Sequence, residues 1–126
     1  SEKKLFLDMF ISLMRLAYMR NIKELRKWSE TAAAYGRERQ KRMLTYFMRL
    51  VRENFVYNFH IGELNYMTQD EENFARNFAR FVNEANVIEL SELMNRAIRD
   101  IGQNANPKIV FFDMATHIIV SLIRKP

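Results

Sequence analysis

Apolar side chains recur along most of this chain at intervals of three and four residues, the spacing that places them on one side of an α-helix. Residues 69–82 show the pattern with Phe74, Phe78 and Phe81. The stripe within residues 87–101 consists of Leu90, Met94, Ala97 and Ile101. The pattern therefore predicts amphipathic helices that each bury one side.

Residues that commonly begin or end a helix refine these boundaries. Together with the stripes they predict six helices, over residues 3–19, 21–34, 37–55, 69–82, 87–101 and 107–125. Three pairs have the spacing of a capping box, in which each side chain accepts a hydrogen bond from the other residue's amide: Asn21 with Glu24, Thr68 with Glu71, and Asn86 with Glu89. Asn106 followed by Pro107 is typical of a helix start, and residues 58–67 are predicted to form a loop around Gly62.

Composition agrees with an all-helical fold. The 126 residues include three Gly and two Pro, too few for a β protein with many turns, and 48% of the residues are hydrophobic, enough for one core. No internal repeat or low-complexity linker divides the chain. We therefore expect residues 1–126 to form one domain, an all-α, single compact bundle of five to six helices.

The formal net charge of +5 is unevenly distributed. Residues 20–52 carry ten Lys and Arg against three Glu, a net charge of +7, whereas residues 53–126 are acidic overall. The helix predicted over 37–55 places four cations opposite its apolar side, and we call them the basic face: Lys41, Arg42, Arg49 and Arg52. Such a face can follow nucleic-acid phosphates, remain solvated, or form salt bridges with an acidic neighbour. The aromatic residues of this helix share its apolar side, so no base-stacking platform is predicted.

The last predicted helix is apolar around about half of its circumference and the first around more than that, where a surface helix typically needs about 100°. A small bundle can bury a helix completely only at its centre, so two such helices indicate apolar surface left over for another subunit. The alternative is that one of the two is the central helix. We expect Phe6 and Phe10 of the first helix to contribute to this interface. In the last helix we expect Phe111, Ile118 and Leu122 to face another subunit, and Phe112, Ile119 and Ile123 to face the core.

No arrangement typical of catalysis is present. His60 and His117 are the only imidazoles and are far apart in sequence, there is no Cys, and the isolated glycines form no phosphate-binding loop. We therefore expect no enzyme activity, no metal, no cofactor and no small-molecule substrate. No apolar run exceeds four residues, so no membrane segment is predicted, and the lack of Cys fits a reducing compartment, the cytoplasm.

Two segments carry a family resemblance. One is the run from Gly36 to Leu44 at a helix start, followed by an amphipathic helix with Arg49 and Arg52. The other is Asn104-Ala105-Asn106-Pro107-Lys108-Ile109-Val110, which opens the last helix. With these two segments the chain resembles the C-terminal domain of bacterial DNA polymerase III clamp-loader subunits, most closely the delta-prime subunit. The resemblance extends over residues 5–125.

The resemblance implies a collar domain, a helical bundle that packs with its counterparts in other clamp-loader subunits into a pentameric ring. The chain begins at Ser1 with a helical pattern within three residues, and we expect the family's two AAA+ modules to lie N-terminal to it. The implied function is non-catalytic subunit assembly in DNA replication, with DNA contacted only through the complex. The alternative is a free-standing helical domain that binds nucleic acid with its basic face.

Overall fold

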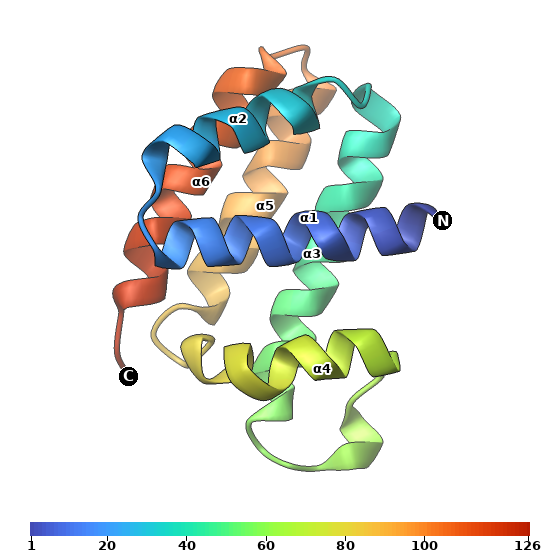
Figure 1. Cartoon of the computed structure of the whole chain (residues 1–126), viewed down its shortest axis with the longest axis vertical. Helices are drawn as coiled ribbons and strands as arrows, with labels where there is room; N and C mark the ends of the chain where they lie inside the picture. The colour runs from blue at the N-terminus through green and yellow to red at the C-terminus, as the bar shows by residue number, and fades with distance from the viewer.

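The computed structural model describes all 126 residues and contains helices without any strand (Figure 1). The six α-helices are α1 (Glu2–Tyr18), α2 (Ile22–Ala33), α3 (Arg37–Tyr57), α4 (Gln69–Phe78), α5 (Val87–Gly102) and α6 (Pro107–Ile123). Two short 3₁₀ turns, η1 (Gly62–Leu64) and η2 (Ala79–Phe81), flank α4. The predicted all-α bundle of five to six helices is confirmed.

The helices form two crossing groups. In Figure 1, α3, α5 and α6 run roughly along the long axis, whereas α1, α2 and α4 lie across them. The largest contacts join α3 to α5 and α2 to α6, and α6 also packs against α1 and α5. The segment between α3 and α4 extends below the bundle in this view.

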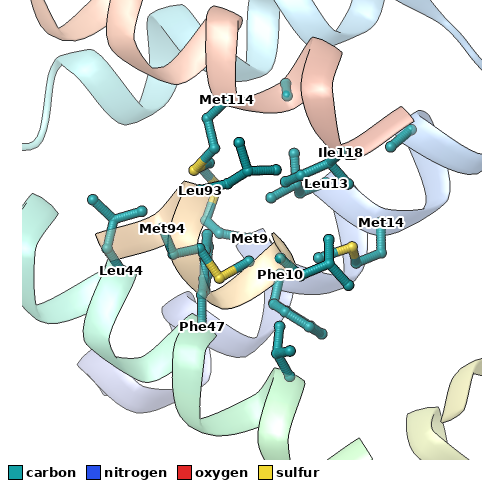
Figure 2. Packing of buried hydrophobic residues seen from close by; sticks show 14 of the residues in the cluster. Met9, Phe10, Leu13, Met14, Leu44, Phe47, Leu93, Met94, Met114 and Ile118 are labelled. Carbon is teal, nitrogen blue, oxygen red and sulfur yellow. The ribbon is translucent and has the colours of Figure 1, made fainter. Parts of the chain in front are cut away.

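One hydrophobic core joins the helices. It contains 27 buried residues, drawn from every α-helix. Figure 2 shows its centre, where Phe10 and Leu13 of α1 lie among side chains of α3, α5 and α6, including Phe47, Met94 and Ile118. Phe10 also makes edge-to-face contact with Phe47, at a centroid distance of 5.4 Å. A single core of this extent explains why the chain forms one bundle.

Most of the helix starts are set by the predicted caps. The Thr68–Glu71 capping box is complete, because Thr68 Oγ1 accepts from the Glu71 amide and Glu71 Oε1 accepts from the Thr68 amide. Asn21 caps α2 by accepting from the Glu24 amide, and Asn106 accepts from the Lys108 and Ile109 amides at the start of α6. At Gly36, a φ of +85° lets the chain turn from α2 into α3.

The third predicted capping box, Asn86 with Glu89, is wrong. Asn86 is fully buried, and its amide nitrogen donates to the carbonyl oxygens of Phe81 at 2.8 Å and Ser121 at 3.0 Å. Its side-chain oxygen accepts from the amide of Asn83 instead of an amide of α5. Asn86 therefore ties the α4–α5 connection to the end of α6.

Three helix ends differ from the prediction by two residues or more, and one of them is the end of α3, at Tyr57 instead of residue 55. The fourth helix ends at Phe78 and continues as the tighter turn η2, where the prediction extended it to residue 82. The last helix ends at Ile123 instead of residue 125. Asn58 explains the earlier end of α4, since its side-chain amide donates to the carbonyl oxygens of Ala79 and Val82. These bonds hold the chain in a turn at the end of α4.

Substitution of Asn106 and of Asn86 by Ala is expected to reduce stability by different amounts. Asn106→Ala removes an exposed cap and is expected to lower the free energy of unfolding by about 1 kcal/mol. Asn86→Ala leaves two carbonyl oxygens and an amide unpaired in or near the core, and is expected to cost about 3 kcal/mol. Urea denaturation of both variants measures the difference. An equal cost for the two would contradict the structural role of Asn86.

Candidate functional site

The five residues predicted to form a subunit interface lie in the core instead. Phe10, Phe111 and Ile118 have no exposed surface, and Phe6 and Leu122 are less than 10% exposed. Figure 2 shows Ile118 pointing into the side chains of α1 and α5. None of the five can contact another subunit while the bundle is folded, so this prediction is wrong.

The physical reason is the position of α6. It packs against α1, α2 and α5, and Phe111, Ile118 and Leu122 lie on the side of α6 that is buried by this packing. The opposite side of α6 faces outward, where Ile109, Val120 and Ile123 are more than half exposed, and Phe112 and Ile119, which were assigned to the core with Ile123, are half-buried. Ser121, which lies on the polar stripe of the helix, is fully buried and donates a hydrogen bond to Glu89 of α5.

Adjacent residues of α6 test this correction. Leu122 is 8% exposed and Ile123 is 51% exposed. Leu122→Ala is expected to lower the free energy of unfolding by about 2–5 kcal/mol because it leaves a cavity, and Ile123→Ala by less than about 1 kcal/mol. Chemical denaturation followed by circular dichroism measures both values. A larger loss for Ile123→Ala would restore the original orientation of α6.

The basic face of α3 is largely occupied by carboxylates of the same chain. Glu2, at the start of α1, accepts from Arg42 at 2.9 Å and from Arg39 at 3.2 Å. The hydrogen bond from Arg42 lowers the pKa of Glu2. Lys41 pairs with Glu38 at 2.9 Å on the same helix. Of the four predicted residues, Arg52 alone makes no ion pair.

Arg49, the fourth of these cations, belongs to a buried polar cluster. Its Nη2 lies 2.6 Å from Glu71 Oε2, and the Tyr46 hydroxyl donates to the same oxygen at 2.6 Å. Burial raises the pKa of Glu71, but hydrogen bonds from Tyr46 and the Thr68 amide, together with Arg49, bring it below its usual value. Burial and Glu71 raise the pKa of Tyr46. The cluster fixes the start of α4 on α3.

The lowered pKa of Glu71 predicts a pH-dependent contribution to stability. The ionised carboxylate stabilises the fold above its ordinary pKa of 4.5, and this contribution is lost as the pH falls through the lower pKa of the folded state. Glu71→Gln is expected to lower the free energy of unfolding by about 2 kcal/mol at pH 7 and by less in acid. Urea denaturation at both pH values measures this. The control variant is Glu72→Gln, because Glu72 makes no ion pair. If Glu71→Gln lowered the free energy of unfolding by the same amount at pH 7 and in acid, this would contradict the prediction.

Exposed apolar side chains gather on the loop between α3 and α4. Phe59, Ile61, Leu64 and Tyr66 are 43–73% exposed and lie within eight consecutive residues. This segment extends away from the bundle (Figure 1). We call these four side chains the loop surface. The sequence analysis placed a loop here but assigned it no function, although four large apolar residues in a predicted loop were a visible signal.

Glu53 of α3 fastens this loop. Its side chain is 2% exposed and accepts from the Tyr66 amide at 2.6 Å, and the Asn65 side-chain amide donates to the Glu53 carbonyl oxygen at 3.0 Å. Arg49 Nη1 donates to the Tyr66 carbonyl oxygen at 3.0 Å. The loop surface is therefore presented on a backbone that α3 holds at several points.

The imidazoles do not form a site. His60 and His117 are both exposed, and His117 Nδ1 lies 2.8 Å from the carbonyl oxygen of Asp113 on its own helix. No group of three His, Cys, Asp or Glu side chains is arranged to bind a metal ion. None of the helices has the length and apolar character needed to cross a membrane.

No family model, no curated protein and no solved structure matches this chain. Its function is therefore argued from its residues and their arrangement.

Proposed function

We propose that this chain is a non-catalytic assembly domain of a bacterial DNA polymerase III clamp-loader subunit. Its partners are the other subunits of the complex that loads the sliding clamp, and it meets DNA only through that complex. The compartment that goes with this function is the cytoplasm. The proposal combines the resemblance described above with the surface of the bundle.

The segment that carries most of the resemblance has a defined local role. Residues 104–110 form the turn from α5 into α6, where Asn104 has a positive φ and Asn106 caps the helix. The turn places the first residues of α6 so that Phe111 enters the core beside Trp28, at a centroid distance of 5.8 Å. Residues 104–110 therefore help to specify the fold of the bundle, and such a role is in keeping with a scaffold domain.

The observation that carries the proposal is the loop surface. Apolar side chains that project on a fastened loop lose little conformational entropy on binding and remove apolar area from water. Leu64 and Tyr66 are 51% and 73% exposed, and they gather with Phe59 and Ile61 within eight residues into one apolar surface, the kind of surface that marks a protein interaction site. A subunit-assembly domain requires such a surface, whereas a catalytic site requires convergent polar groups.

The nucleic-acid alternative has less support. Its basic face retains one cation without an ion pair, Arg52, because the other three are paired with Glu2, Glu38 and Glu71. Binding to phosphates would have to compete with these internal pairs. Two aromatic residues of α3 are also unavailable for stacking there, since Phe47 is fully buried and the Tyr46 ring is covered by the guanidinium of Arg49 at 5.2 Å.

Assembly with purified clamp-loader subunits of the gamma/tau and delta types tests the proposal. The wild-type chain is expected to co-elute with at least one of them in size-exclusion chromatography. The double variant Leu64→Ser/Tyr66→Ser is expected to bind at least about tenfold more weakly, because it removes apolar contact area at the interface.

The control removes two exposed apolar side chains elsewhere. Ile88 of α5 and Ile109 of α6 are 69% and 67% exposed, so Ile88→Ser/Ile109→Ser matches the loop variant in chemistry. Circular dichroism checks that both variants are folded. A folded wild-type chain that binds none of the subunits overturns the proposed function. DNA binding by the chain alone that Arg52→Ala abolishes would favour the nucleic-acid alternative.

A further inference from the structure

A second exposed apolar region lies at the corner where α1 ends, η2 turns and α6 ends (Figure 1). It is a groove of about 620 Å³, and Tyr18, Met19 and Ile123 on its surface are 59%, 61% and 51% exposed. A neighbouring hollow of about 430 Å³ shares Tyr18, Met19 and Phe81 with it. We call the two hollows together the corner groove.

The charged residues of the corner groove are all basic. They are Arg15, Arg20, Arg80, Arg124 and Lys125, and no Asp or Glu lines either hollow. Arg124 pairs with Glu89 at 3.1 Å, and the other four make no ion pair. The corner groove therefore combines exposed apolar surface with four cations that pair with no carboxylate of the chain.

Three of the four aromatic rings of the groove, those of Phe74, Phe78 and Phe81, are poorly placed to stack on nucleic-acid bases, and Tyr18 alone is more than half exposed. Phe74 is stacked on Phe78 at a centroid distance of 4.9 Å, and the guanidinium of Arg15 lies over its ring at 5.8 Å. Phe81 is covered by Arg80 at 5.0 Å and contacts Tyr18 at 5.0 Å. Base stacking needs free ring faces, and those of Phe74 and Phe81 are already engaged.

The rest of the apolar surface suits aliphatic side chains of a peptide. Met19, which is 61% exposed, has a flexible thioether that adapts to differently shaped partners. Ile119 and Ile123 of α6 continue the apolar surface on the other side of Tyr18. A peptide helix with apolar residues on one side and carboxylates along the edges of that side matches both the apolar side chains of the groove and the Arg and Lys residues around them.

We propose that the corner groove binds an acidic amphipathic peptide segment of a partner protein. The apolar side chains of the segment lie on Tyr18, Met19 and Ile123, and its carboxylates pair with the surrounding Arg and Lys side chains. This binding is independent of the loop surface and does not require the proposed clamp-loader function.

Fluorescence anisotropy with a designed probe tests this. The probe is a fluorescein-labelled helix of about 18 residues, with Leu and Phe at positions i, i+3, i+4 and i+7 and Glu at the others. A scrambled peptide of the same composition, a peptide with Lys in place of Glu, and a single-stranded oligothymidylate are measured in parallel at about 0.15 M salt. Saturable binding of the amphipathic acidic probe, at least about tenfold tighter than that of the scrambled peptide, is expected.

Matched variants distinguish an effect of the groove residues on binding from an effect of the net charge of the chain. Arg80→Glu/Lys125→Glu is expected to weaken binding at least about tenfold. Arg96→Glu/Arg99→Glu, which makes the same charge change on exposed residues of α5, is expected to alter it less than about twofold. Met19→Ser is expected to weaken binding at least about fivefold, and Ile109→Ser to leave it unchanged. Circular dichroism verifies the fold of each variant.

Three results would overturn the proposal. They are absence of probe binding, equal loss in the two charge variants, and tighter binding of the oligothymidylate that the groove variants abolish. Sedimentation that shows a dimer of the wild type and a monomer of Met19→Ser would also overturn it, since the occupant would be a second copy. Leu64→Ser/Tyr66→Ser should bind the probe as the wild type does, so failed subunit assembly with intact probe binding contradicts only the clamp-loader proposal.

Discussion

Helix α6 packs against three other helices, α1, α2 and α5, and the rest of the fold depends on these contacts. The side of α6 that meets these helices must be apolar or internally hydrogen-bonded, because an unpaired polar group would be costly there. The one polar side chain that it buries, Ser121, is satisfied by Glu89 of α5. The carbonyl oxygen of Ser121 accepts from Asn86, which also bonds to Phe81 in the turn after α4. The core thus accounts for the buried side of the last helix, whereas Ile109, Val120 and Ile123 remain exposed.

Ion pairs with residues distant in sequence neutralise several of the cations that the sequence concentrates in residues 20–52. Arg39 and Arg42 hold Glu2 from a distance of about forty residues along the chain, and Arg49 holds Glu71. Exposed pairs such as Arg42 with Glu2 contribute little to stability. They nevertheless leave Arg52 as the only one of the four basic-face cations without an ion pair, whereas four of the five cations of the corner groove have none. Charge counted along a segment therefore says little about charge on a surface.

Local signals in the sequence predict local structure well. Periodicity located all six helices, and the caps at Asn21, Thr68 and Asn106 are where the residue types placed them. The orientation of α6 could not be predicted in the same way. A helical wheel shows which residues share a side, but the apolar arc of this helix is wider than the side that the core covers, so the wheel does not show which part of the arc is buried. Its direction is decided by Glu89 and Asn86, which are more than thirty residues away along the chain.

The loop surface was missed for a related reason. Apolar residues in a predicted loop can fold back onto the core, and only the bonds from Glu53 and Arg49 to Tyr66 hold the loop extended. Glu53 looks like an ordinary helix carboxylate in the sequence, since its partner is thirteen residues away in a segment without periodicity. Its burial is visible only once α3 and the loop are placed together.

Helix α4 physically connects the two exposed surfaces. At its start, Arg49 bonds both to Glu71 and to the carbonyl oxygen of Tyr66, so the same guanidinium holds the helix and the loop surface. At its end, Asn58 of the loop bonds to Ala79 and Val82, which flank the turn that carries Phe81 into the corner groove. Because α4 has only ten residues, these end contacts and the packing of Phe78 determine its position. The loop surface and one wall of the corner groove therefore share α4 as their support, through separate bonds at its two ends.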